Sequence, residues 1–382
     1  MNKISQSIVG ALLLVTFPAA SLAAGWVADF RFDADATHDD NFLMNDAEQE
    51  SWIYSLKPKA SLIYLTPVIS SELDAKVAVK RYSEFDQFDS EDPAFNWKNS
   101  YKRARSTWSL DFGYSENSQR DLAEEDTGQF DSNTLVETVY VDPGVVFRIT
   151  EKDDLGITLG YTERDYDTDD FSDNENETLG VNWQRKVDQV LSTTANISVS
   201  QYRANRPNIS SNETDYEKIN VGFIYKHSES LNISGSTGYF QSDSRKRIIS
   251  GPTVVIVDSD NSGMLLNLSL DYSQESNDWS LNLSRGLYPS SQGDVEERDS
   301  VGIGFEHRFT SRSSSGINVA WYDTDTDSVA EDRESINVSP YYHYRLTEKM
   351  TLQTSYVFRS FDRQSGDKVE SNRVKLGLRY SF

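Results

Sequence analysis

The sequence lacks cysteine altogether and is poor in histidine and in basic residues. It has four histidines, and 61 aspartate and glutamate residues outnumber 37 lysine and arginine residues, which gives a net charge of −24. Without cysteine the chain cannot hold a disulfide, a thiolate metal site or a cysteine nucleophile. The negative charge argues against nucleic acid as a partner, because phosphates would repel the chain. Aromatic residues nevertheless make up 12% of the sequence, which is too many for a disordered chain.

Long apolar runs are also missing, apart from a short one near the N-terminus. Lys3 precedes the apolar residues 8–17, and small residues up to Ala23 follow Pro18. A positive start, a short apolar core and small residues before a cleavage point are typical of a secretory signal peptide. The run is too short for a spanning helix, which needs about 20 apolar residues. We therefore predict a signal peptide over residues 1–23 and a mature protein, 24–382, that can cross a membrane only with strands.

What the sequence has instead is a regular alternation of apolar and polar residues. It is seen in the segments 26–33, 52–64, 264–273 and 373–382. Such alternation places one set of side chains on each face of a β-strand. The segments run to about ten residues or more, as tilted strands in a bilayer do, whereas the average strand of a soluble protein has about five or six. The sequence therefore predicts a transmembrane antiparallel up-and-down β-barrel with its apolar face against lipid.

The connections between these segments alternate between short and long. Short periplasmic turns and long outer loops are typical of outer-membrane barrels. Keeping the strands alternately up and down requires a further turn at 103–105, which gives about 18 strands, or 16 on a lower count, in a single barrel domain over residues 24–382. The short connections are 66–69, 150–154, 226–229, 274–277 and 347–349, and the long ones are 38–50, 84–93, 117–133, 163–177, 242–261 and 323–333.

Two segments of the predicted barrel, 141–152 and 338–349, share a proline within a strand and a Thr-Glu-Lys turn. We interpret them as products of hairpin duplication. Pro143 and Pro340 lack an N–H group, so each should cost a ladder hydrogen bond or lie at a bulge.

The C-terminal strand carries the most specific pattern. The chain ends at Phe382, with Tyr380 and Leu378 at alternate positions before it. A terminal aromatic residue that closes an amphipathic strand resembles the assembly signal of outer-membrane proteins in Gram-negative bacteria. The resemblance implies the cell outer membrane as the location. It also implies lipid, lipopolysaccharide and the barrel-insertion machinery as partners.

Basic residues concentrate on the polar face near the junction of the first and last strands. In one interpretation they pair inside the barrel with Asp29, Asp33, Asp74 and Asp111. In the other they form a basic stripe along a pore, which would favour the passage of anions through low-dielectric surroundings. The members of the stripe are Arg31, Lys57, Lys59, Lys76, Lys80, Arg345, Arg359, Arg373, Lys375 and Arg379.

The outer loops are expected to be acidic, with Asp-x-Asp spacing at 165–177 and 323–332. Such oxygen ligands can bind calcium, but neither run has the glycine and the terminal glutamate of an EF-hand. We therefore expect solvated loops, and neither a metal nor a cofactor. His38 is the only histidine expected at the outer rim, and a lone histidine in a charged loop does not indicate a catalytic dyad, so we expect no enzyme.

Three short motifs carry a resemblance to a known family. Phe30-Arg31-Phe32 leads to Asp39-Asp40-Asn41-Phe42, Leu56-Lys57-Pro58-Lys59-Ala60 follows in the next strand, and Leu378-Arg379-Tyr380-Ser381-Phe382 ends the chain. With the overall layout they resemble the porin-type barrels that are encoded with exopolysaccharide export systems. The resemblance implies an outer-membrane conduit for an exopolysaccharide that works with a periplasmic polysaccharide-export protein. The basic stripe agrees with an anionic polymer as cargo.

Two other functions fit the same pattern. The barrel could be a general diffusion porin for small anionic solutes, or a non-conducting surface barrel whose loops bind ions or a partner. A porin usually carries a long inward-folding loop. The candidate for such a loop is the segment 242–261, with its apolar residues 254–257.

Overall fold

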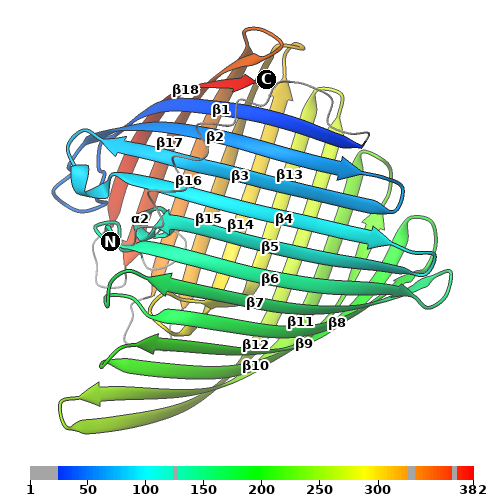
Figure 1. The fold of residues 1–382 in the computed structure, drawn as a ribbon, viewed down its shortest axis with the longest axis horizontal. Coiled ribbons are helices and arrows are strands. Elements are labelled where there is room, and N and C mark those ends of the chain that lie inside the picture. Colours follow the sequence, from blue (N-terminus) through cyan, green and yellow to red (C-terminus); the bar gives the residue numbers. More distant parts are fainter. Residues whose placement is uncertain (1–24, 124–127, 326–331, 364–367) are drawn as a thin grey trace.

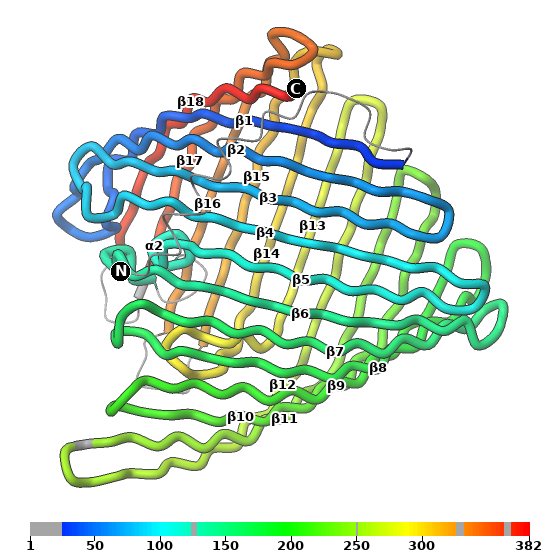
Figure 2. The backbone as a smooth tube through the Cα atoms, viewed as in Figure 1, coloured from blue at the N-terminus to red at the C-terminus, as the bar shows by residue number. Residues whose placement is uncertain are grey.

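The computed structural model describes residues 25–123, 128–325, 332–363 and 368–382, so the predicted signal peptide lies outside it. The described residues form a closed barrel of 18 antiparallel strands, shown as a ribbon in Figure 1 and as a tube in Figure 2. The predicted fold class is confirmed. In the part of the chain that is described, no helix is long and apolar enough to span a membrane.

The strands follow one another around the barrel in chain order, and β1 also pairs with β18, which closes the wall. Two short helices lie in the outer connections, η1 (Asp86–Phe88) and α2 (Gln119–Leu122). The strands are β1 (Trp26–Asp39), β2 (Ser51–Leu65), β3 (Ile69–Tyr82), β4 (Ser90–Lys102), β5 (Ser106–Ser118), β6 (Leu135–Arg148), β7 (Asp153–Tyr166), β8 (Asp173–Lys186), β9 (Leu191–Arg206), β10 (Ser210–Lys226), β11 (Leu231–Ser250), β12 (Thr253–Gln274), β13 (Asn277–Pro289), β14 (Val295–Arg308), β15 (Ser313–Asp325), β16 (Arg333–Arg345), β17 (Met350–Arg363) and β18 (Val369–Ser381).

The strand register determines which side chains face the lumen. Arg379 of β18, Asp33 of β1 and Lys57 of β2 lie directly opposite one another, so their side chains share the inner face. The intervening positions form the exterior, where large apolar side chains such as Val374 and Leu376 are 58% and 57% exposed. An apolar belt around a closed barrel fits a lipid environment, where pairing between neighbouring strands satisfies the backbone groups that lipid cannot.

Aromatic pairs mark the rim that carries the short turns. The rings of Trp26 and Tyr64 lie 5.0 Å apart, and those of Trp279 and Phe305 lie 4.2 Å apart. Aromatic girdles of this kind lie at the interface between membrane and water. An even strand number, an apolar belt and one rim of short turns make up the architecture of outer-membrane proteins, and the location of this protein in the outer membrane follows from it.

The structure bears out the turn expected between the fourth and fifth strands, because β4 ends at Lys102 and β5 begins at Ser106. The strand prolines also behave as expected. The pairing of β6 with β7 is interrupted at Pro143, and that of β16 with β17 at Pro340. The register is the same on both sides of each gap, so the prolines cost ladder hydrogen bonds and produce no bulge.

Two of the predicted outer connections are shorter than expected, because the chain continues as strand through most of each segment. Most of the acidic run 163–177 lies in β7, which extends to Tyr166, and in β8, which begins at Asp173. The segment 242–261 does not fold inward either. It belongs to a hairpin of β11 and β12 that turns at Gly251 and projects beyond the neighbouring strands (Figures 1 and 2). The β-branched residues 254–257 favour strand, and Gly251 supplies the positive φ that the turn needs. In the other acidic run, Asp323 and Asp325 belong to β15, and residues 326–331 lie outside the described part.

Candidate functional site

The connection between β5 and β6, within the predicted long outer connection 117–133, folds into the outer mouth of the barrel, the end opposite the short turns. Its residues Gln119, Arg120, Ala123 and Phe130 are all almost completely buried, which a loop surrounded by water would not be. Phe130 packs edge-on against Phe361 of β17, with ring centroids 5.6 Å apart. A buried cluster of Met44, Ala123, Phe130, Phe361 and Val369 fixes the segment to the wall formed by β17 and β18.

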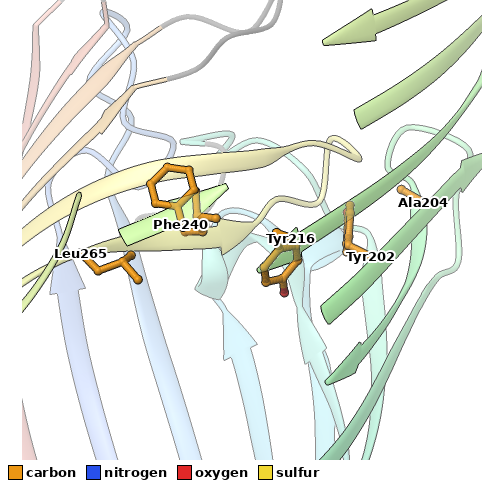
Figure 3. Packing of buried hydrophobic residues seen from close by; sticks show 6 residues of the cluster. Tyr202, Ala204, Tyr216, Phe240 and Leu265 are labelled. Carbon is orange, nitrogen blue, oxygen red and sulfur yellow. The ribbon is translucent and has the colours of Figure 1, made fainter. Parts of the chain in front are cut away.

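A second inward segment, Ser290 to Asp294, connects β13 with β14. The Tyr202 hydroxyl on β9 donates a hydrogen bond of 2.8 Å to the Ser290 carbonyl, and the Asn212 amide on β10 donates one of 2.9 Å to the Gly293 carbonyl. The ammonium group of Lys246 on β11 lies 2.8 Å from the Asp294 carboxylate. These contacts hold the segment against the wall of β9, β10 and β11. Figure 3 shows the buried aromatic side chains of that wall, among them Tyr202, Tyr216 and Phe240.

The two inward segments meet within the mouth. Nε2 of Gln119 donates a hydrogen bond of 3.3 Å to Oγ of Ser291, and both residues are buried. One segment is fixed to β17 and β18 and the other to β9–β11, on the opposite side of the barrel, so together they span the mouth. The mouth is therefore narrowed by two segments that are far apart in sequence.

Beside this narrowing, the buried carboxylate of Asp39 on β1 lies close to three arginines. The carboxylate of Asp39 lies 2.7 Å from Arg373, 3.0 Å from Arg359 and 3.8 Å from Arg120. Ser371 donates a further hydrogen bond of 2.5 Å to it. Three guanidinium groups around Asp39, with Asp121 4.0 Å from Arg120, leave an excess of positive charge beside the narrowed mouth.

Arg120, on the inward segment, was not among the predicted site residues. Its guanidinium lies 3.5 Å from the centre of the Phe42 ring and donates a hydrogen bond to the Phe42 carbonyl. Burial, together with the nearby charge of Arg373, lowers the pKa of Arg120 to about 10. The group therefore stays charged at neutral pH. Nothing in the local sequence distinguishes this arginine, because its partners are on distant strands.

The register places all ten members of the predicted basic stripe on the inner face, in columns along β1, β2, β3, β16, β17 and β18. The carboxylate of Asp33 lies 2.6 Å from Arg379 and 3.0 Å from Arg31. That of Asp35 lies 3.1 Å from Lys375 and 3.3 Å from Lys57. Each carboxylate is thus shared by two cations, so this charged wall keeps an excess of positive charge.

Other members of the stripe differ in their surroundings. Lys59 lies 3.0 Å from Asp74, as the pairing interpretation expected, whereas the expected partner Asp111 meets Lys98 at 3.8 Å. For Lys76 and Arg345, the described residues provide no ion-pair partner. Their charges are thus not offset by a contact in the described part of the wall.

Lys80 and Arg359 hold the inward segment rather than line an open lumen. The Lys80 ammonium group lies 2.6 Å from Asp92 and forms a second ion pair with Asp121 of α2. The Arg359 guanidinium lies 5.7 Å from the ring centre of Phe130. These two residues therefore connect the charged wall to the segment that narrows the mouth.

The opposite wall of the lumen is polar and nearly neutral. Its inward positions on β8, β9 and β10 include Asn182, Asn196 and Asn220, which lie side by side in register. Lys218 is the exception, and its ammonium group lies 4.9 Å from the centre of the Tyr216 ring. A solute in the lumen would thus meet cations on one side and amide and hydroxyl groups on the other.

The histidines and the acidic residues do not suggest another site. His38 lies on the exterior of β1, 3.4 Å from Glu50 and with its ring 5.0 Å from that of Trp52, so it is outside the lumen. His343 faces the lumen beside Tyr341, with ring centroids 4.8 Å apart. Within the described ranges, no group of three or more histidine, aspartate or glutamate side chains is placed to hold a metal ion.

No family model and no curated protein sequence matches the chain. Among solved structures, it is similar to OccAB4 of Acinetobacter baumannii at 10% identity and a TM-score of 0.48, over 94% of this chain and 99% of that one. OccAB3 of the same organism aligns at 12% identity and a TM-score of 0.49, over 94% and 100%. OccK5 (OpdH) of Pseudomonas aeruginosa aligns at 11% and 0.48, over 95% and 100%. Similarities this weak do not indicate a function, which has to be argued from the residues of this chain.

Proposed function

We propose that the protein is an outer-membrane channel for small anionic solutes. The observation that supports this most is the narrowed mouth, where Arg120, Arg359 and Arg373 surround Asp39 at the meeting point of two inward segments. Barrels of 16 to 18 strands leave an aqueous lumen, so a segment folded into it sets the size of what passes. Positive charge at a narrow point within a low-dielectric wall attracts anions and repels cations.

Below the mouth, the lumen has a cationic wall on one side and a nearly neutral wall on the other, and this arrangement extends the preference for anions along the channel. The cations of β18 and β2 flank Asp33 and Asp35 at successive levels below the mouth. An anion leaving the arginines at Asp39 therefore meets further cations as it descends. The neutral wall of β8–β10 offers hydrogen bonds to the uncharged part of the solute. This arrangement fits a small carboxylate or phosphate compound better than an uncharged solute.

Export of an anionic exopolysaccharide, which the family resemblance implies, would use the same charged wall. A polymer needs a continuous passage for its whole length. The two inward segments, joined by the Gln119–Ser291 hydrogen bond, lie across the mouth. Export would therefore require the inward segments to move aside, and a periplasmic export protein would have to drive that movement. For this reason the polymer is the second candidate and the small anion the first.

Planar-bilayer recording separates these functions. A channel for small anions shows stable open steps, and its reversal potential in a potassium chloride gradient indicates anion selectivity. Small organic anions should reduce the chloride current by competing for the accessible cations of the charged wall, such as Lys375 and Arg379. A barrel that stays closed without a partner would favour polymer export, provided that deletion of the gene also abolishes surface polysaccharide. A barrel that conducts nothing and whose deletion leaves the polysaccharide unchanged would contradict both.

A further inference from the structure

The hairpin of β11 and β12 ends in an open strand edge. With 20 and 22 residues, these are the longest strands that the structure describes. β12 pairs with β11 along almost its whole length, from Thr253 to Tyr272, but its pairing with β13 begins only at Leu266. Within the described chain, residues 253–260 therefore have a neighbouring strand on one side only. Figures 1 and 2 show this part of the hairpin projecting beyond the other strands.

The first half of this open edge, residues 253–257, is apolar. All residues from 253 to 260 are exposed, and Val254, Val255, Ile256 and Val257 are between 45% and 61% exposed. Unpaired N–H and C=O groups along a strand are a template for another strand, and proteins normally block such edges with lysine, proline, a bulge or a covering segment. Pro252 precedes the edge and Asp258 and Asp260 lie at its other end, but no charged residue or proline lies between Thr253 and Val257. This edge therefore matches a surface that is covered by a partner.

The charges beside the apolar stretch indicate what the partner carries. Asp215, Asp243 and Asp260 lie opposite one another on β10, β11 and β12, so three carboxylates form one row across the hairpin. Like charges opposite one another destabilise a sheet, and a cation at the end of the row would offset them. The next row also ends in a carboxylate at the edge, that of Asp258, which lies 2.9 Å from Arg245. An added strand with lysine or arginine at two alternate positions would complete both rows.

We propose that the open edge of β12 is a docking site for an extended segment of another protein, which adds to the hairpin as a further strand. The segment would have β-branched or other apolar residues beside residues 254–257 and basic residues beside Asp258 and Asp260. Addition of a strand supplies affinity through main-chain hydrogen bonds and specificity through alternate side chains. The edge lies at the rim with the long connections, so the partner meets the protein outside the cell.

A second copy of this chain fits the edge less well. Two copies in one membrane have the same orientation, so a dimer would have its two-fold axis along the membrane normal. This axis would place the two β12 edges parallel to each other, with each residue beside the same residue of the other copy. Asp258 would then lie beside Asp258 and Asp260 beside Asp260. The charges that favour a basic partner therefore disfavour self-association.

A synthetic peptide tests the proposal on the full-length purified protein in detergent micelles. The probe has nine residues, with valine and threonine alternating and two lysines at alternate positions near its N-terminus. Antiparallel pairing would place these lysines beside Asp260 and Asp258. Fluorescence anisotropy measures binding, and hydrogen exchange locates it. We expect slower exchange at residues 253–260 on binding, and binding at least about tenfold weaker for a peptide with glutamate in place of both lysines.

Two matched variants separate the edge from the rest of the hairpin. Val254→Lys places a charge on the edge strand, whereas Ile249→Lys places the same charge at the residue directly opposite on β11, which is not at the edge. We expect Val254→Lys to weaken peptide binding about tenfold or more and Ile249→Lys to leave it within about twofold. Equal loss in both variants, or no binding to the native protein, would overturn the proposal. So would a native dimer that Val254→Lys dissociates, which would assign the edge to a second copy.

Discussion

The guanidinium of Arg373 lies 2.7 Å from the buried carboxylate of Asp39, which joins the last strand of the barrel to the first. Arg359 and Arg120 contact the same carboxylate from β17 and from the inward segment. One acidic side chain thus contributes both to barrel closure and to the narrowing of the mouth.

Asp39→Asn should destabilise the barrel strongly. Removing one partner of a buried ion pair leaves the other charge uncompensated and typically costs roughly 3 to 5 kcal/mol. Here up to three guanidinium groups lose their shared partner. Thermal unfolding in detergent, followed by the loss of the compact band on unheated gels, measures the effect. Asp29→Asn is the control, because Asp29 also faces the lumen but is exposed; equal destabilisation by both variants would contradict the role of Asp39.

Breaking the contact between the inward segments should widen the mouth. The double variant Gln119→Ala and Ser291→Ala removes the buried hydrogen bond of 3.3 Å that spans it. We expect a higher single-channel conductance and more frequent switching between levels, because a contact that joins the two segments is then lost. Asn133→Ala removes an exposed hydrogen bond at the end of the same connection and serves as the control. Unchanged conductance in the double variant would show that these segments do not limit the current.

Neutralising the charged wall should reduce anion selectivity. Lys375→Gln with Arg379→Gln leaves Asp35 and Asp33 with one cation each in place of two. The reversal potential in a salt gradient should move towards the value of a cation-selective channel. The change should be larger at low ionic strength, because less salt is then present to screen the charges of the wall. Lys349→Gln, in a short turn outside the lumen, should leave the reversal potential where it was. An unchanged reversal potential in the double variant would show that other residues determine the anion selectivity.

The contribution of one periplasmic turn to the stability of the fold should depend on pH. The Asp188 carboxylate accepts hydrogen bonds of 2.8 Å from the N–H groups of both Val190 and Leu191, and these bonds lower the pKa of Asp188 below its ordinary value of 3.8. A carboxyl group with a lowered pKa in the folded state stabilises it above the ordinary value, and this stabilisation is lost as the pH falls through the lowered pKa. Asp188→Asn should therefore unfold at a lower temperature than the native protein at pH 7.

The two proteins should become alike in strongly acidic buffer, where the native carboxyl is also uncharged. Thermal unfolding at a series of pH values measures the difference between them. A difference that persists at the lowest pH would mean that the asparagine disturbs the turn itself and that the charge is not responsible.

The fold could be predicted because the alternation of apolar and polar residues along a strand shows which side chains face lipid and which face the lumen. The alternation over 373–382 and 52–64 gave the exterior and the lumen correctly, and the turn at 103–105 followed from counting strand directions. The same alternation placed the basic stripe on the inner face. It could not show that Asp33 and Asp35 are each shared by two cations, because the register between distant strands is needed for that.

The narrowed mouth could not be predicted for the same reason. Gln119 and Ser291 are separated by 172 residues, and no periodic pattern indicates that their segments meet. The long hairpin could have been recognised from its β-branched residues 254–257. It was interpreted as a loop because the charged residues beyond the membrane belt interrupt the apolar alternation. The acidic run in β7 and β8 misled the prediction in the same way.

The pairing of β1 with β18 has a consequence for how the molecule is made. Asp33, Asp35 and Asp39 of β1 form ion pairs across this seam with Arg379, Lys375 and Arg373 of β18. A barrel without β18 would leave one edge of β1 unpaired and would leave Asp33 and Asp35 with one cation each. Closure of the barrel and assembly of the charged wall are therefore the same step.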